Sequence, residues 1–360
     1  MAQKIRVLVV DDSALTRQVL VSALSSADDI EVIGTAPDPY VARDKIKELE
    51  PDVITLDVEM PRMDGLTFLE KLMRGHPMPV VMVSTLTEKG SATTLRALEL
   101  GAVDFVAKPT FDVRKNLALV AQDVVEKVRV ARFAHVRTPF DLGSVRRLPQ
   151  VTHGALPETT DKIIAVGAST GGTEALKVFL TAMPPDAPGI VITQHMPQLF
   201  TKQFAERLNT LCAIEVKEAE TGDRVRTGRA LIAPGNFHMK VERQGGYYRV
   251  AVVEGETVNG HRPSVDVMFD SLAEHAGKNC VGVIMTGMGN DGAKGLLNLK
   301  QKGSRTVAQD EATCVVFGMP RVAIQLGAAD LVLPIDRMAE AALAFARGGA
   351  VKPPSSAPTK

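Results

Sequence analysis

The stretch IIAVGASTGGTEAL, residues 163–176, decides the fold class of this chain. An apolar run ends at a serine bracketed by glycines, and a helical pattern begins directly afterwards. Gly167 and Gly171 tolerate backbone angles that a Cβ would forbid, so we expect a sharp turn there. A serine on such a strand-to-helix turn presents its hydroxyl outward, close to the first N–H groups of the helix. The pattern predicts either a nucleophile at Ser169 or a helix cap by Ser169 or Thr170.

The composition of the 360 residues is that of a globular protein with about two domains. Charged residues make up 23% and hydrophobic residues 45% of the chain. Lys+Arg and Asp+Glu number 42 each, so no global basic field favours nucleic acid. Trp is absent and aromatic residues make up only 4%, which leaves little for base stacking. We therefore expect no nucleic-acid partner.

Three sequence features bear on location. Cys212, Cys280 and Cys314 are odd in number and widely spaced, which is typical of a reducing compartment. Residues 1–6 enter a strand pattern at once, which leaves no room for a signal peptide. No apolar run reaches the roughly 18 residues that span a bilayer. These features predict a cytoplasmic protein that is not inserted in a membrane.

The first 130 residues alternate short apolar runs with amphipathic stretches. Strands are predicted at residues 5–10, 31–36, 53–56, 80–83 and 105–107. Helices are predicted between them, and a last helix covers roughly residues 117–133. Five β/α units of this kind imply a parallel, doubly wound, flavodoxin-like sheet.

A second alternating region follows from residue 161. Its strands are predicted at 163–166, 190–193, 230–233, 281–285, 306–308 and 331–333, and a hairpin at 238–253. The fold class is therefore α/β, with two doubly wound parallel-sheet domains.

The pattern fails between the two regions, where prolines, glycines and an Arg-Arg pair interrupt it. We predict a first domain at 1–133, a linker at 134–160 and a second domain at 161–347. The last residues, 348–360, are rich in Pro, Ser and Gly and are predicted to be disordered.

Charged residues follow three of the strands predicted in the first domain. These are Asp11 and Asp12, then Asp57, and then Lys108. Ligands of parallel sheets bind beyond the carboxyl ends of the strands, where these residues would meet. Clustered carboxylates repel one another unless a hard cation such as Mg²⁺ lies among them, and the lysine would pair with a phosphoryl oxygen. The alternative, two helix caps and a surface charge, explains each residue but not the set.

Residues 1–130 resemble the receiver domain of two-component response regulators. The matching residues are Asp11-Asp12, Asp57 within LDVEMPRMDG, Ser84 at the end of VVMVS, Phe105 and Lys108-Pro109. The resemblance implies that a histidine kinase phosphorylates Asp57. It also implies that Mg²⁺ is held by Asp11, Asp12, Asp57 and the backbone carbonyl of Glu59. Ser84, Phe105 and Lys108 would carry the conformational switch.

A serine that transfers acyl groups needs a base within hydrogen-bond reach and a carboxylate that orients the base. His195 directly follows a predicted strand, so it falls at the same sheet edge as Ser169. Asp291 lies on the glycine-rich loop after another predicted strand. The chain order Ser, His, Asp differs from the Ser, Asp, His order of α/β-hydrolases, so geometry must define the roles.

Other interpretations share these residues. His238 and His261 are rivals for the base, or are structural, and Asp291 could cap the helix predicted just after it. The glycines of residues 287–292, with Asp310, match the main pieces of a dinucleotide fingerprint. The charge of Asp291 would oppose a pyrophosphate at that helix N-terminus.

Nearly the whole chain resembles the protein-glutamate methylesterase family of bacterial chemotaxis. The matching segments are GASTGG at 167–172, TQHMP at 193–197, APGNFHM at 233–239, HRPSVDVMF at 261–269, MTGMGNDGA at 285–293 and AQDEATCVVFGMP at 308–320. The resemblance implies that the second domain is a catalytic methylesterase domain acting on methylated chemoreceptors. It also implies that the unphosphorylated first domain covers the catalytic edge until Asp57 is phosphorylated.

The implied mechanism begins with attack by Ser169 on the γ-carbonyl of a methylated glutamate. His195 takes the serine proton and Asp291 fixes the tautomer of His195. Backbone N–H groups near Thr170 and Met288 are plausible oxyanion donors. Ester hydrolysis would need no cofactor, and glutamine deamidation could use the same chemistry.

Three hypotheses from different classes result. They are a phospho-activated methylesterase, a nicotinamide oxidoreductase fused to a receiver, and a non-catalytic phospho-switch. Binding of NAD(H) tests the second hypothesis. The effect of Ser169→Ala on turnover tests the third.

Overall fold

The computed structural model describes residues 3–85, 87–108, 113–136 and 162–349. The chain divides into two compact units, Met1–Arg146 and Arg147–Lys360, which we call the N-terminal unit and the C-terminal unit. Most of the predicted linker, 134–160, and of the predicted tail, 348–360, lies outside the described residues. The domain boundaries proposed from the sequence therefore stay predictions.

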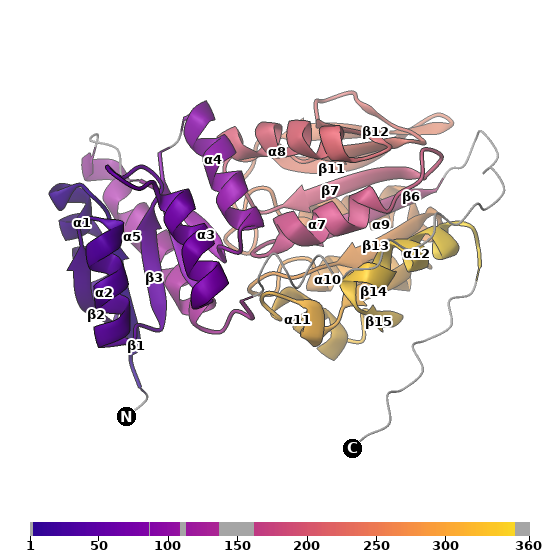
Figure 1. The fold of residues 1–360 in the computed structure, drawn as a ribbon. Coiled ribbons are helices and arrows are strands. Elements are labelled where there is room, and N and C mark those ends of the chain that lie inside the picture. The colour runs from indigo at the N-terminus through magenta and orange to yellow at the C-terminus, as the bar shows by residue number, and fades with distance from the viewer. Residues whose placement is uncertain (1–2, 86, 109–112, 137–161, 350–360) are drawn as a thin grey trace, which may run out of the picture. The chain divides into compact units, whose positions relative to one another are not determined.

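The N-terminal unit is built on a five-stranded parallel sheet in the order β2-β1-β3-β4-β5 (Figure 1). The strands are β1 (Ile5–Val10), β2 (Ile30–Ala36), β3 (Val53–Asp57), β4 (Val80–Ser84) and β5 (Asp104–Ala107). The helices are α1 (Ala14–Ser25), α2 (Pro39–Leu49), α3 (Gly65–Gly75), α4 (Glu88–Glu99) and α5 (Val113–Arg132). This order is flavodoxin-like, so the predicted fold is confirmed.

The C-terminal unit is built on a seven-stranded sheet in the order β15-β14-β13-β6-β7-β10-β8, and all its neighbouring strands are parallel. The strands are β6 (Ile163–Ala168), β7 (Gly189–Gln194), β8 (Glu215–Glu218), β10 (Arg229–Ile232), β13 (Cys280–Ile284), β14 (Arg305–Gln309) and β15 (Leu331–Leu333). The central strands β6, β7 and β13 are buried along their whole length, as expected where helices cover both faces of a parallel sheet. The second doubly wound domain is confirmed.

Helices flank this sheet in two groups (Figure 1). One group, in which α7 packs against α8 and α12, is α7 (Gly172–Thr181), α8 (Gln198–Leu211) and α12 (Ile335–Ala346). The other group, in which α10 packs against α9 and α11, is α9 (Val265–His275), α10 (Ala293–Gln301) and α11 (Met319–Gln325). Two short 3₁₀ turns, Gly277–Asn279 and Glu311–Thr313, complete the described helical segments.

A small antiparallel sheet, β11-β12-β9, packs against α9. Its hairpin, β11 (His238–Gln244) and β12 (Tyr247–Val253), confirms the prediction at 238–253. The sequence reading did not predict β8, nor β9 (Arg224–Val225). The reason is plain: β8 reads Glu-Val-Lys-Glu at the edge of its sheet, and β9 has two residues, so neither carries an apolar run.

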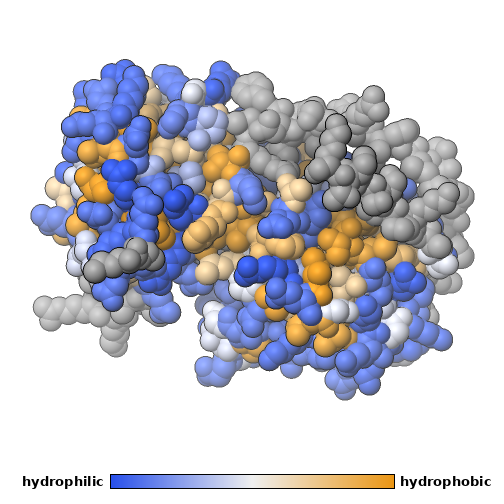
Figure 2. Space-filling model, turned by 90° about the horizontal axis from the view of Figure 1, so that it is seen from below, coloured by the Kyte–Doolittle hydropathy of each residue, from blue (hydrophilic) through white to orange (hydrophobic). Residues whose placement is uncertain are grey.

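On the face drawn in Figure 2, hydrophilic residues are interspersed with apolar patches. Large apolar side chains that are exposed among the described residues include Leu15, Phe133 and Leu199. Within the part of the chain that the structure describes, no helix is long and apolar enough to cross a membrane.

Candidate active site

Ser169 and His195 meet because their strands are neighbours in register. Ala168 at the end of β6 pairs with Gln194 at the end of β7, so the residues that follow leave the sheet side by side. The N–H of His195 donates to the carbonyl of Ala168 at 3.1 Å, which fixes the backbone there. His195 Nδ1 lies 3.1 Å from Ser169 Oγ. The sequence prediction placed both residues at this edge, and the structure brings them within hydrogen-bond reach.

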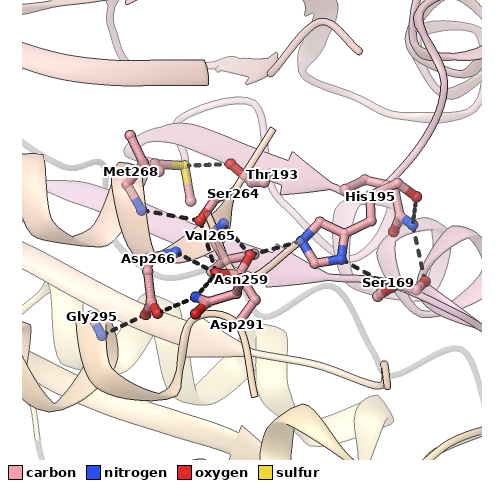
Figure 3. A network of polar contacts seen from close by, with 12 residues as sticks. Ser169, Thr193, His195, Asn259, Ser264, Val265, Asp266, Met268, Asp291 and Gly295 are labelled. Atoms are coloured by element: carbon pink, nitrogen blue, oxygen red, sulfur yellow. Dashed lines mark hydrogen bonds and ion pairs between the residues drawn. The ribbon is translucent and has the colours of Figure 1, made fainter. Parts of the chain in front are cut away.

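Asp291 completes a line of three side chains (Figure 3). It lies on the loop between β13 and α10, and β13 is the other neighbour of β6. Its Oδ2 lies 2.8 Å from His195 Nε2, and its side chain is only 1% exposed. A carboxylate can only accept, so His195 Nε2 carries the proton and Nδ1 offers its lone pair to the hydroxyl of Ser169. This ring orientation is the reverse of the familiar serine-protease arrangement, in which Nε2 faces the serine.

The carboxylate of Asp291 lies at the N-terminus of α9, where several donors converge on it. Oδ2 accepts from the N–H of Val265 at 2.6 Å, and Oδ1 accepts from Ser264 Oγ and Asn259 Nδ2 at 2.8 Å each. Burial alone would raise the pKa of Asp291, but hydrogen bonds from His195, Asn259 and the Val265 N–H outweigh it and hold that pKa below its usual range. Asp291 is therefore ionised at neutral pH.

The capping alternatives for these residues are wrong. The N-cap of α10 is Gly292, and the N-cap of α7 is Gly171, and neither helix has a side-chain cap. Ser169 and Thr170 therefore do not cap α7, and Asp291 does not cap α10. Asp291 instead accepts from backbone N–H groups at the start of α9.

The two glycines around Ser169 act differently from each other. Gly171 has φ +77°, so the predicted sharp turn occurs there. Gly167 lies inside β6, and a Cβ on it would be 2.3 Å from Val265 Cγ1. Gly167 is needed for the close approach of α9, which corrects the expectation of a turn at this position.

The two rival histidines have separate places. His238 is buried, and both its ring nitrogens bond within the protein: Nε2 donates to the carbonyl of Glu256 at 2.8 Å and Nδ1 accepts from the N–H of Ser264 at 3.2 Å. This is the structural role. The ring of His261 stacks on that of His195, with centroids 3.7 Å apart and planes at 14°. Nothing in the sequence pattern predicts this stacking.

Thr170 and Met288, whose N–H groups are the predicted oxyanion donors, lie near Ser169 in different ways. Thr170 follows Ser169 directly, and its carbonyl accepts from Thr286 Oγ1 at 3.0 Å. Met288 is half-buried on the loop after β13, next to Gly287, where a Cβ would lie 2.6 Å from Ser169 Cβ. The oxyanion role of their N–H groups stays a prediction. The N–H of Ser169 itself donates to the carbonyl of Thr286.

An acidic pocket lies at the carboxyl edge of the N-terminal sheet. Carboxylate oxygens of Asp11, Asp12 and Asp57 lie within 4.8 Å of one another, because Val10 and Leu56 pair at the ends of β1 and β3. Lys108 Nζ lies 2.7 Å from Asp57 Oδ2 and 3.4 Å from Asp11 Oδ2. The predicted cluster of three carboxylates and one lysine is therefore present.

The electrostatics of this pocket fit a divalent cation. Burial raises the pKa of Asp57 to about 6, and the nearby charge of Asp11 adds to the effect. Asp11 Oδ2 is buried and, apart from the 3.4 Å ion pair with Lys108, has no hydrogen-bond partner. One lysine balances two buried carboxylates only in part, so an oxygen-preferring cation such as Mg²⁺ suits the residues present.

The other residues predicted for the N-terminal site lie around the pocket. The N–H of Glu59 donates to Asp57 Oδ1 at 3.1 Å, and Glu59 is exposed. Ser84 is buried at the end of β4, with Oγ 3.4 Å from the carbonyl of Gly90. Phe105 is buried, and Lys127 Nζ lies 4.9 Å above its ring. Their switch roles stay predictions.

The folds of the two units, and the residues at the carboxyl edges of their sheets, are those of a phospho-receiver domain and of a serine-hydrolase-type domain. Two sequence-family models match the chain: CheB methylesterase over residues 164–342 and response regulator receiver domain over residues 7–120. The chain is 57% identical over 342 residues to protein-glutamate methylesterase/protein-glutamine glutaminase 1 of Geobacter metallireducens, covering 93% of this chain and 94% of the relative. It is 54% identical over 346 residues to the protein of the same activity name from Salmonella typhimurium, covering 96% and 98%.

A solved structure is also similar. The CheB methylesterase catalytic domain of Thermotoga maritima is 42% identical, covers 51% of this chain and 97% of its own, and gives a TM-score of 0.50. The chain belongs to the protein-glutamate methylesterase/protein-glutamine glutaminase family.

Proposed function

We propose that this protein is a serine esterase that hydrolyses glutamate γ-methyl esters on chemoreceptors and deamidates receptor glutamines. The observation that carries the proposal is the position of His195 between Ser169 Oγ and the buried carboxylate of Asp291. Family membership supports the choice of substrate, because relatives that cover nearly the whole chain have this activity in their names.

In the first step, Ser169 Oγ attacks the γ-carbonyl carbon of the ester while His195 Nδ1 takes the hydroxyl proton. Asp291 stabilises the imidazolium that forms, since its charge lies at Nε2. Collapse of the tetrahedral intermediate breaks the C–O bond to the methoxy group, which leaves as methanol with the proton from His195. We propose the N–H groups of Thr170 and Met288 as the donors to the oxyanion; one such donor contributes about 3 kcal/mol.

In the second step, water attacks the acyl-enzyme and gives a proton to His195. The bond between the acyl carbon and Ser169 Oγ breaks, Oγ recovers the proton, and a free glutamate is released. A glutamine side chain follows the same course, with ammonia as the leaving group. None of these steps needs a cofactor.

We further propose that a histidine kinase phosphorylates Asp57 and that this raises the esterase activity. Asp11, Asp12, Asp57 and the carbonyl of Glu59 would hold Mg²⁺, which supplies positive charge to the carboxylates and to the incoming phosphoryl group. Lys108, now paired with Asp57, is placed to pair with a phosphoryl oxygen. Ser84 and Phe105 would carry the conformational switch that follows phosphorylation of Asp57. The free cysteines Cys212, Cys280 and Cys314 support a cytoplasmic location.

The test measures methanol release from methylated receptor membranes, with and without a small-molecule phosphodonor and Mg²⁺. Ser169→Ala should release no methanol, and Asp57→Asn should keep basal release but not respond to the phosphodonor. Undiminished release by Ser169→Ala would refute the catalytic assignment. A response of Asp57→Asn equal to that of the unaltered protein would refute the regulatory one.

A further inference from the structure

The segment Val258-Asn259-Gly260-His261 forms a tight two-residue hairpin. The N–H of Val258 donates to the carbonyl of His261 and the N–H of His261 donates to the carbonyl of Val258, both at 3.0 Å. Asn259 has φ +54° and Gly260 has φ +79°. Left-handed backbone at both central positions defines a type I′ turn, for which Asn-Gly is a strongly preferred pair. The geometry of this turn is therefore dictated by its own sequence.

Asn259 lies between two buried carboxylates (Figure 3). Its Nδ2 donates to Asp291 Oδ1 at 2.8 Å and to Asp266 Oδ2 at 2.7 Å. The other oxygen of Asp266 accepts from the N–H of Gly295 at 2.7 Å. One amide thus engages Oδ1 of Asp291 and leaves Oδ2 directed at His195. It also separates two negative charges that would otherwise face each other directly.

The other side of the same turn contacts the second member of the triad. The ring of His261 lies 3.7 Å from that of His195 and nearly parallel to it. A stacked ring restricts rotation of the imidazole about its Cβ–Cγ bond, and this rotation would move Nδ1 away from Ser169 Oγ. Two positions apart in the chain, Asn259 and His261 therefore constrain Asp291 and His195 respectively.

The turn is anchored by the residue that follows it, and its two central residues are not part of the hydrophobic core. Asn259 and Gly260 are exposed, and a Cβ on Gly260 would meet no atom within 4 Å. Arg262 anchors the following backbone through its guanidinium, which donates to Asn236 Oδ1 at 3.0 Å and to the carbonyl of Gly255. A residue that is exposed, conformationally demanding and bonded to a buried catalytic carboxylate is poorly explained by packing.

We propose that the Asn259-Gly260 turn is a positioning element of the triad, in which Asn259 aligns the Asp291 carboxylate and His261 fixes the plane of the His195 ring. This rests on the proposed role of Ser169, His195 and Asp291. Catalytic groups must be held within about 10–20° of the productive orientation, so loss of either constraint lowers turnover more than substrate binding.

The matched pair Gly260→Val and Gly260→Asn tests the turn without removing either contacting side chain. Valine is strained at positive φ and should displace both Asn259 and His261, whereas asparagine tolerates the left-handed region. Asn259→Ala and His261→Ala then remove the two contacts one at a time. Because Gly260 is exposed and a Cβ there meets no atom within 4 Å, we expect the urea midpoint of full-length Gly260→Asn to be close to that of the unaltered protein.

Two readouts separate the inference from the proposed function. The first is the rate at which a fluorophosphonate probe labels Ser169, measured against pH, which needs no receptor substrate. The second is kcat and KM for methanol release. Gly260→Val and Asn259→Ala should lower the labelling rate and kcat about 10- to 100-fold with KM little changed, and Gly260→Asn should recover most of the loss.

The pH profile distinguishes positioning from a purely structural role. Without the Asn259 amide, Asp291 Oδ1 loses one of the donors that hold the carboxylate against His195, whose other face is covered by the His261 ring. The dependence of the labelling rate on pH should therefore change in Asn259→Ala, while a loss of folded protein would lower only the amplitude. Labelling of folded Asn259→Ala and Gly260→Val at the unaltered rate and pH would overturn the inference. If the unaltered protein is labelled elsewhere than at Ser169, the proposed nucleophile is wrong and the inference fails with it.

Discussion

The two units of this chain use the same architectural position for opposite kinds of chemistry. In the N-terminal sheet the chain goes to β2 on one side of β1 and then to β3 on the other. In the C-terminal sheet it goes to β7 on one side of β6 and later to β13 on the other. Both arrangements create a crevice at the carboxyl ends of the strands, where ligands of such sheets bind. What each crevice can do depends on the residues that follow the strands.

The difference lies in how the negative charge is satisfied. In the N-terminal pocket, Asp11 Oδ2 has no hydrogen-bond partner and burial raises the pKa of Asp57. In the C-terminal site, donors surround both oxygens of Asp291 and lower its pKa. Carboxylates without enough donors attract a cation, whereas a carboxylate saturated with donors orients a base. The number of hydrogen-bond donors around a carboxylate, more than its position in the fold, therefore decides whether it favours a metal ion or orients a histidine.

The largest expected effect comes from Ser169→Ala, which should abolish the esterase activity of the C-terminal unit and leave phosphorylation of the N-terminal unit unchanged. We expect methanol release to fall about 10⁶-fold, as when the nucleophile of a serine protease is removed. Phosphorylation of Asp57 by a phosphodonor should proceed at the unaltered rate, because its pocket belongs to the other sheet. Phosphoprotein gels and methanol release from the same preparation check both statements. Slower phosphorylation would mean that the two crevices are not chemically independent.

Asp291→Asn should lower kcat about 10⁴-fold, because an amide that donates to His195 Nε2 selects the wrong tautomer. The substitution keeps the shape of the side chain but replaces an acceptor by a donor beside the Val265 N–H. Steady-state kinetics of methanol release measure the effect. Asp266→Asn, which changes the neighbouring buried carboxylate, is the matched control and should cost far less. Equal losses in the two variants would contradict the special role of Asp291.

Asp57 and Asp291 should contribute pH dependences of opposite sign to the stability of their units. The pKa of Asp57 is raised from 3.8 to about 6, so its folded form binds a proton more tightly than its unfolded form. Its contribution is complete below pH 4 and is lost as the pH rises through 6, a change of about 3 kcal/mol without Mg²⁺. The pKa of Asp291 is lowered, so its contribution is complete above pH 4 and is lost only at lower pH.

Urea unfolding of the full chain in EDTA, followed by hydrogen exchange in each unit, measures these trends. Asp57→Asn should flatten the N-terminal dependence between pH 4 and 6 and leave the C-terminal unit unchanged. An N-terminal slope as steep in Asp57→Asn as in the unaltered protein would contradict the contribution assigned to Asp57.

Gly167→Ala should produce the smallest of these effects, a loss of about 2 kcal/mol in the stability of the C-terminal unit, from overpacking against α9. A Cβ at this position would lie 2.3 Å from Val265 Cγ1. In a Val265→Ala background the same substitution should cost much less, since its neighbour has gone. Urea unfolding of the four proteins measures the coupling. Additive losses would mean that contact with Val265 is not what excludes a side chain at position 167.

The strands that consist of continuous apolar runs could be predicted from the sequence. β1, β15 and the hairpin have the predicted bounds, and the other predicted strands differ by one or two residues at one or both ends. Because residues after parallel strands share an edge, the meeting of Ser169 with His195, and of Asp11 with Asp57, could be anticipated without coordinates. This rule does not by itself place Asp291, since that residue lies seven residues beyond the end of β13.

Contacts between distant loops could not be predicted in this way. Asn259 was visible only as part of an Asn-Gly pair, which indicates a turn but not the carboxylates that it contacts. The expectation of a turn at Gly167 was wrong, because a strand glycine next to a packed helix cannot be told from a turn glycine by sequence. β8 was missed because an edge strand with charged residues has no apolar signature.

The placement of Asp291 against the first turn of α9 ties the proposed catalytic role of this residue to the integrity of that helix. The same carboxylate that orients His195 also accepts from Ser264 Oγ and from the N–H groups of Val265 and Asp266. A descendant of this protein that lost its nucleophile, and with it any selection for turnover, would still gain stability at the start of α9 from an anion at this place. An aspartate here is thus no proof of activity in a relative, and the residue at the Ser169 position is the better criterion.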